Sequence, residues 1–109
     1  MKIETNNGTV EVTMSGRLDT MNSESILSEI IDKIDEKNKN IILDLKELDY
    51  ISSSGLRVLI KLRNKVTELK GGICLLSPQE FVVDVLKTTS FDKLFPMFSS
   101  KEECSEYLK

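Results

Sequence analysis

A chain of 109 residues, 39% hydrophobic and 30% charged, is long enough to fold as one domain around its own core. The formal net charge of -3 argues against a general nucleic-acid-binding protein, and no apolar run approaches the roughly 20 residues that span a bilayer. The absence of histidine removes the commonest general base and metal ligand, so a Ser-His-Asp or Cys-His site cannot form within the chain.

The N-terminal residues predict a β-hairpin. Two short alternating stretches within residues 2–14 flank Asn7-Gly8, and Asn-Gly between such stretches is a hairpin signal. The second stretch alternates well enough to predict a strand with one buried face. Residues 15–20 are expected to form the loop that follows it.

A first helix is predicted after this loop. Apolar side chains recur at helical spacing from Ile26 to Ile34, and the helix is expected to fade near Asn38. Thr20 or Asn22 is a candidate for its N-cap, because both residue types accept hydrogen bonds from free backbone N–H groups.

Two further strands and a long helix are predicted in the middle of the chain. The apolar run Asn40–Leu45 is typical of a strand buried on both faces, as a central parallel strand is. Apolar positions then follow a helical stripe from Leu56 to Leu69, and Gly71-Gly72 is expected to end this helix with a left-handed cap. Gly72–Leu76 is predicted to form another buried strand.

The C-terminal residues predict two helices and a short strand. Ser77-Pro78 is expected to begin a helix, with the proline near its first position. Leu94–Phe98 is a candidate edge strand, because its proline cannot donate a ladder hydrogen bond. Lys101–Leu108 is predicted to form the last helix, with Ser99 or Ser100 as its cap.

The order of these elements predicts an α/β fold in one domain over residues 1–109. Strands that alternate with helices imply right-handed crossovers and parallel pairing. We therefore expect a mostly parallel, mixed sheet of four to five strands, with an N-terminal antiparallel hairpin and about four helices.

The cysteines bear on the cellular location. Cys74 lies in an apolar run and Cys104 near the C-terminus, and no charged region followed by an apolar one opens the chain. Isolated thiols without a secretory signal are typical of reduced packing residues, so a cytoplasmic protein is expected. No cofactor and no metal site is predicted.

The most informative segment is Tyr50–Leu56, in which three serines and a glycine stand between an apolar strand and a helical pattern. Backbone N–H groups point outward at a helix N-terminus and the helix dipole is positive there, so that place tolerates a phosphate well. Ser52, Ser53 and Ser54 are therefore either ordinary capping residues or a phosphorylation switch.

Three motifs in order, Gly16-Arg-Leu-Asp19, Leu43-Asp-Leu45 and Tyr50-Ile-Ser-Ser-Ser-Gly-Leu56, give the chain a family likeness. Their order and spacing resemble the STAS domain, which is named for sulfate transporters and anti-sigma-factor antagonists. The likeness covers essentially the whole chain, and the length resembles a freestanding bacterial antagonist rather than a transporter tail.

The resemblance implies partner switching in the control of a sigma factor. In such antagonists a serine is phosphorylated by a GHKL-type kinase that is also the anti-sigma factor. The unphosphorylated antagonist binds that kinase and frees the sigma factor, and a PP2C-type phosphatase removes the phosphate. No enzymatic activity, nucleic-acid binding or membrane insertion is implied for the antagonist.

The family motif assigns a role to each residue around the serines. Alignment on Gly55-Leu56 makes Ser53 the acceptor and Ser54 the following hydroxyl residue. Ser52 occupies the position of an aspartate and supplies no charge. The expected partner-binding surface is listed here: Asp19, Ser52, Ser54, Gly55, Leu56 and Arg57.

Charge patterning adds one expectation and leaves its alternative open. Arg57, Lys61 and Lys65 recur every four residues on one face of the predicted helix. They form either a surface that steers an acidic partner or a solvated outer face. Asp19 is likewise either part of the partner-facing surface or a loop and capping residue.

Two other functional hypotheses compete with the phosphorylated antagonist. A constitutive STAS scaffold or structural subunit, without phosphate control, is motivated by the uncharged Ser52. An enzyme is disfavoured, since the chain contains no Gly-x-Ser-x-Gly elbow, no phosphate-binding loop of the Gly-x-x-x-x-Gly-Lys type and no histidine.

Overall fold

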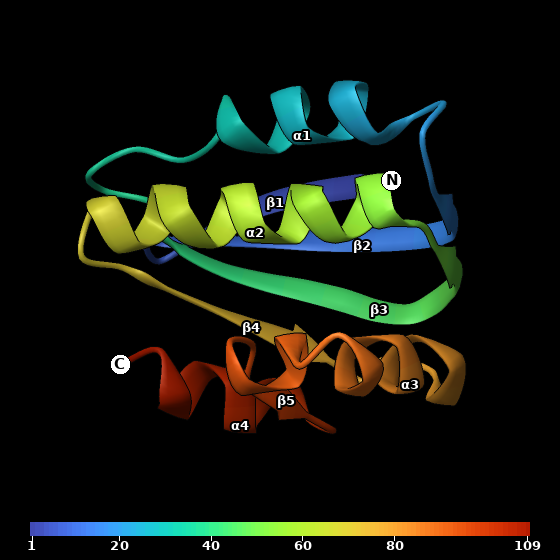
Figure 1. Cartoon of the computed structure of the whole chain (residues 1–109). Helices are drawn as coiled ribbons and strands as arrows, with labels where there is room; N and C mark the ends of the chain where they lie inside the picture. The colour runs from blue at the N-terminus through green and yellow to red at the C-terminus, as the bar shows by residue number, and fades with distance from the viewer.

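The computed structural model describes residues 1–109 as a five-stranded sheet in the order β1-β2-β3-β4-β5 (Figure 1). The strands are β1 (Lys2–Asn6), β2 (Thr9–Leu18), β3 (Asn40–Ile51), β4 (Gly72–Leu76) and β5 (Met97–Phe98). The helices are α1 (Ser23–Ile31), α2 (Ser53–Glu68), α3 (Glu80–Thr88) and α4 (Lys101–Tyr107), with a 3₁₀ turn at Phe91–Lys93. Only the β1–β2 pair is antiparallel, so the predicted mixed α/β fold is confirmed.

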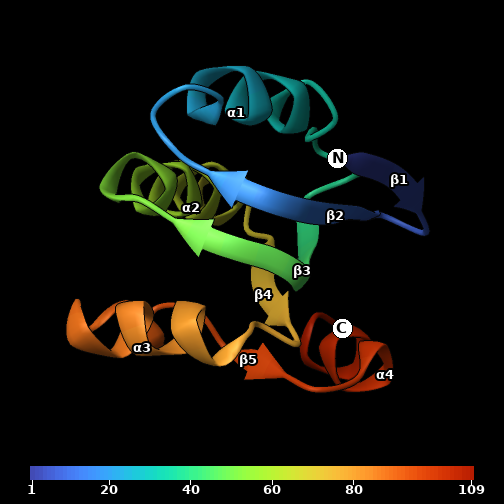
Figure 2. The same cartoon turned by 90° about the vertical axis from the view of Figure 1, so that its right-hand side faces the viewer.

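Helices cover the two faces of the sheet unequally. The main core lies between the sheet and α1, α2 and α3, and includes the fully buried Phe95 just before β5. On the opposite face, α4 covers only a small cluster of Ile42, Cys74 and Cys104 (Figure 2). None of the helices combines the length and the apolar character that a membrane crossing requires.

The hairpin forms where the Asn-Gly signal predicts it. Asn7 and Gly8 both have positive φ, 52° and 84°, as a turn that matches the twist of two antiparallel strands requires. Val10, Val12 and Met14 of β2 are buried, which confirms the predicted alternation of this strand.

β2 extends through most of the predicted loop, so that expectation is wrong for residues 15–18. The ladder continues through two register shifts and pairs Arg17 with Tyr50 and Leu18 with Ile51. Gly16 lies between the exposed residues Ser15 and Arg17; it is half-buried with positive φ (72°), and a Cβ atom there would meet open space. The apolar signal of the sequence pattern therefore ends at Met14, although Leu18 is buried as well.

β3 is twice as long as predicted, for a related reason. Residues Ile41–Leu43 are buried on both faces as expected, because β2 and β4 flank this part. Pairing with β4 stops at Asp44, and beyond it β3 pairs only with β2. The polar residues of the second half of β3 lie on exposed positions there, while Leu48 and Ile51 stay in the core.

The predicted first helix was too long at its C-terminal end. α1 stops at Ile31 rather than near Asn38, although Ile34 remains buried beyond it. The Asp35 carboxylate accepts hydrogen bonds from the backbone N–H groups of Lys37 and Asn38, at 2.9 and 2.8 Å. Such local side-chain bonds offer the backbone an alternative to the helix.

Two further boundaries differ from the prediction. The left-handed residue after α2 is Lys70 (φ 65°) rather than Gly71. Gly71 is needed instead for close approach, because a Cβ atom there would collide with the carbonyl oxygen of Lys39. α3 begins at Glu80 and not at the Ser77-Pro78 pair, since Ser77 itself has positive φ (49°).

The C-terminal elements agree with the prediction in kind. The strand predicted over Leu94–Phe98 shrinks to Met97–Phe98. Of the two candidate caps for the last helix, Ser100 is the one used, and its hydroxyl accepts from the backbone N–H of Glu103 at 3.2 Å.

Candidate functional site

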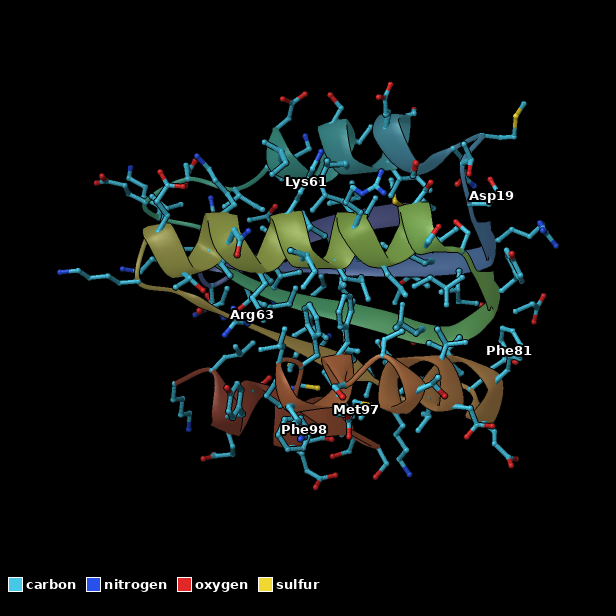
Figure 3. All side chains as sticks on the ribbon, viewed as in Figure 1. Asp19, Lys61, Arg63, Phe81, Met97 and Phe98 are labelled. Atoms are coloured by element: carbon cyan, nitrogen blue, oxygen red, sulfur yellow. The ribbon has the colours of Figure 1, made fainter.

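The candidate site lies where β2 and β3 end and α1 and α2 begin. β2 and β3 are parallel, so their carboxyl ends meet at one side of the sheet, where Asp19 lies (Figure 3). The backbone N–H of Ser52 donates to the carbonyl of Leu18 at 3.0 Å, which joins the loop after β2 to the serine motif. The structure thus brings together two motifs that are more than 30 residues apart in the sequence.

Each of the three serines has a different environment. Ser52 is the N-cap of α2, and its hydroxyl accepts from the backbone N–H of Gly55 at 3.2 Å. Ser54 shares a hydrogen bond of 3.1 Å with the hydroxyl of Thr20 in the loop before α1. Ser53, between them, is the first residue of the helix and is exposed. Of the three, only the Ser53 hydroxyl is both accessible and held by no such bond.

Gly55 and Leu56 lie beneath this surface rather than on it. Leu56 is buried in the main core and Gly55 is buried against the end of β2. A Cβ atom on Gly55 would lie 2.7 Å from the carbonyl oxygen of Leu18, so only glycine allows α2 to start this close to the sheet. These two residues set the position of Ser53, whereas Arg57 is exposed on the next turn.

Asp19 fixes the loop between β2 and α1. Its carboxylate accepts from Arg17 Nε at 3.1 Å and from the backbone N–H of Met21 at 3.0 Å. The bond from Arg17, assisted by those from the backbone, holds the pKa of Asp19 below its ordinary value. Met21, which this loop presents, is almost fully exposed.

Asn22 precedes α1 as predicted but does not cap it with its side chain. The side-chain Oδ1 of Asn22 accepts from the backbone N–H of Asp19 at 2.9 Å, and its side-chain Nδ2 donates to the backbone carbonyl of Arg17 at 2.7 Å. The Asn22 side chain therefore holds the preceding loop closed.

A stack of three side chains at the same end of the sheet was missed by the sequence analysis. The Arg17 guanidinium lies 4.1 Å from the ring centroid of Tyr50, and the Tyr50 ring stacks on Phe81 with centroids 6.2 Å apart. Phe81 remains about half exposed. The three residues come from β2, β3 and α3, so no short-range pattern could have joined them.

The basic residues of α2 divide into two environments. Arg57 and Lys61 line a cleft of about 210 Å³ between α2 and α1, together with Thr20, Ser23 and Ser54. Lys65, one turn further along α2, does not line this cleft. No three His, Cys, Asp or Glu side chains are grouped so that they could hold a metal ion.

Comparison with protein families decides the classification. The model of the STAS domain family matches residues 1–104. The chain belongs to the STAS family.

Named relatives and a solved structure agree with this classification. The STAS domain is 28% identical to BtrV of Bordetella bronchiseptica, over 94% of this chain and 88% of BtrV. It is 29% identical to an anti-sigma F factor antagonist of Paenibacillus polymyxa, over 93% of this chain and 87% of that protein. The fold of the anti-sigma factor antagonist SpoIIAA of Bacillus in its unphosphorylated form matches with a TM-score of 0.76 at 22% identity, over 94% and 89% of the two chains. The phosphorylated form of SpoIIAA matches with a TM-score of 0.75.

Proposed function

We propose that this STAS domain is a cytoplasmic anti-sigma-factor antagonist that docks on an anti-sigma factor with GHKL-type kinase activity. Phosphate on Ser53 switches this docking off, and a PP2C-type phosphatase restores it. The protein acts as a binding module and carries out no catalysis of its own. The single observation that carries the proposal is the exposed Ser53 hydroxyl at the start of α2, between two serines whose hydroxyls are hydrogen-bonded.

The position of Ser53 suits a phosphate that leaves the fold intact. The first backbone N–H groups of a helix have no partner within it, and the Ser52 hydroxyl uses only that of Gly55. The N–H groups of Ser53 and Ser54 therefore remain available to an anion at the positive end of the helix dipole. Phosphorylation adds about −1.5 to −2 charge and strong acceptor oxygens at this point.

The same phosphate would block a partner that packs on this end of α2. A docked protein would have to bury a dianion and accommodate its bulk beside Asp19, which is already charged. Loss of docking needs little energy, since about 1.4 kcal/mol changes an affinity tenfold. The relative from Paenibacillus polymyxa carries the name of an anti-sigma F factor antagonist, which supports the same role for this chain.

The proposal is tested with the GHKL-type kinase of the source organism and ATP, followed by mass spectrometry of tryptic peptides. Phosphate is expected on Ser53, and Ser53→Ala should abolish the modification while it preserves kinase binding. Ser53→Asp should weaken binding by at least about tenfold, through charge at the interface. Ser99→Ala, a serine change directly after the edge strand β5, is the control. An unmodified Ser53, or phosphate on another serine, contradicts the proposal.

A second candidate, the constitutive scaffold, rests on Ser52. This residue caps α2 with its hydroxyl but brings no carboxylate to the acceptor, so the local charge that a kinase could recognise is reduced. A stable complex whose affinity is the same for wild type, Ser53→Ala and Ser53→Asp would favour the scaffold over the switch.

A further inference from the structure

The cleft between α1 and α2 opens beside the serine motif. Both helices run in the same direction, so their N-terminal ends lie at the same side of the molecule (Figure 1). Ser23 and Glu24 line the cleft from the first turn of α1, and Ser54 lines it from the first turn of α2. Two helix dipoles therefore direct their positive ends toward this region, which favours an anion.

Ser23 also indicates that this cleft binds a polar group. It is the only polar residue in the buried set, at 7% exposure, and its hydroxyl makes none of the side-chain hydrogen bonds of the molecule. Every fully buried side-chain oxygen or nitrogen of the protein has a hydrogen-bond partner. Because the Ser23 hydroxyl has none, its oxygen is not fully buried and contacts open space. The open space that Ser23 lines is this cleft. Ser23 therefore brings to the cleft a hydroxyl that has no hydrogen-bond partner within the protein.

Two basic side chains without an ion-pair partner line the same cleft. Arg57 and Lys61 are exposed and take part in none of the five ion pairs of the protein. Lys61 lies between α1 and α2 (Figure 3). Glu24 also lines the cleft, but it makes no ion pair with either cation, so the cleft retains an excess of one positive charge.

We propose that this cleft receives a carboxylate side chain, aspartate or glutamate, from the anti-sigma factor. The inference rests on the proposed function and names the group that the partner supplies. The volume of about 210 Å³ is below the roughly 300 Å³ at which pockets for small ligands begin, so a side chain fits better than a free metabolite. The Arg57 guanidinium, the Lys61 ammonium and the hydroxyls of Ser23 and Ser54 are the donors.

This arrangement also explains how a phosphate on Ser53 would act. Ser53 and Arg57 are four residues apart on α2, which places them as neighbours on the helix surface. A phosphate on Ser53 pairs with Arg57 and repels the incoming carboxylate. The switch thus removes one donor of the cleft and adds like charge beside it.

The test measures the affinity of the full chain for the purified GHKL-type kinase by titration calorimetry at two salt concentrations. Arg57→Gln and Lys61→Gln are each expected to weaken binding about tenfold and to reduce its salt dependence. Lys65→Gln is the matched control, with the same charge change on the same helix one turn outside the cleft, and should stay within about twofold. Both target residues are exposed, and circular dichroism verifies the fold of each variant.

The outcomes separate this inference from the proposed function. If the wild type does not bind the kinase, both fail. If the wild type binds but Arg57→Gln, Lys61→Gln and Lys65→Gln all bind equally well, the inference is overturned and the proposed function stands. A carboxylate is identified by charge reversal: the loss caused by Lys61→Glu should be restored by changing one aspartate or glutamate of the kinase to lysine. Failure of every such pair contradicts the assignment of a carboxylate.

Discussion

Gly55 shows how a single residue without a side chain positions the serine motif. In most helix positions a change from glycine to alanine stabilises a protein by about 1 kcal/mol. At Gly55 the added Cβ would lie 2.7 Å from the carbonyl oxygen of Leu18 and 2.8 Å from a side-chain carbon of Ile51. Overpacking of this kind costs about 1–3 kcal/mol and forces the backbone to shift.

We therefore predict that Gly55→Ala lowers the stability of the domain. Urea unfolding followed by circular dichroism should show a lower midpoint than for the wild type. Asn64→Ala, at an exposed position of the same helix, is the control and should leave the midpoint almost unchanged. A midpoint for Gly55→Ala equal to or above that of the wild type would show that α2 does not approach β2 as described.

Asp19 gives the domain a dependence on acid. Its folded pKa is lowered, chiefly by the hydrogen bond from Arg17, so the folded state favours the ionised carboxylate. The resulting stability is complete above the ordinary aspartate pKa of about 3.9 and is lost as the pH falls through the lowered folded value.

The corresponding variant is Asp19→Asn. Its urea midpoint should be below that of the wild type at neutral pH, and the difference should shrink as the pH falls below about 4. Arg17→Gln removes the largest cause of the shift and should behave in the same direction. A difference between Asp19→Asn and wild type that is independent of pH would contradict the assigned role of the carboxylate.

At the scale of elements, the start of α2 depends on Ser52. Its hydroxyl accepts from the backbone N–H of Gly55, and replacing such a cap by alanine costs about 1 kcal/mol. Ser52→Ala should therefore destabilise the domain by about that amount in urea unfolding. Aspartate is an equally good cap, so Ser52→Asp should keep wild-type stability while it adds charge beside Ser53. Loss of stability in both variants would argue against capping as the role of Ser52.

Elements with a strong local signal were predicted, and those defined by tertiary contact were not. The hairpin was predicted from Asn7-Gly8, because a turn with positive φ favours these residue types. The central strand was predicted from Ile41–Leu43, because burial on both faces requires consecutive apolar residues. The end of β2 was missed, because Ser15, Gly16 and Arg17 place no apolar side chain between the buried Met14 and Leu18. The second half of β3 was missed for a different reason: it has a neighbour on one side only, so its polar residues resemble a loop.

In the candidate site, too, the residues of a local pattern were predicted and those joined by tertiary contact were not. Its serines were found because they stand together at one helix start, a short-range pattern. The stack of Arg17, Tyr50 and Phe81 was not, since parallel pairing of β2 with β3 and packing of α3 are needed to bring the three together. The cleft lined by Ser23 and Lys61 likewise exists only once α1 and α2 lie side by side.

At the scale of the whole molecule, the two free thiols report on opening of the fold. Cys74 and Cys104 are fully buried, and burial raises the pKa of both thiols, so little reactive thiolate is present. Reaction with a thiol-specific chromogenic reagent should be at least about a thousandfold slower in native buffer than in denaturant, in proportion to the rarity of the open state. Cys104→Ser leaves Cys74 as the single probe in β4. Rapid reaction of that variant under native conditions would contradict the described packing of α4 on the sheet.

The stacked ring of Tyr50 also makes the protein its own optical probe. The chain has two tyrosines and no tryptophan, so its intrinsic emission comes from Tyr50 and Tyr107 alone. Tyr107 lies on α4 against Phe98, whereas Tyr50 lies under Arg17, the residue that holds Asp19. In Tyr107→Phe the remaining fluorescence arises from one ring beside the candidate site. A bound protein that displaces Arg17 should then change the fluorescence of Tyr50. If that protein has no tyrosine or tryptophan at its contact surface, the change reports binding without an attached label.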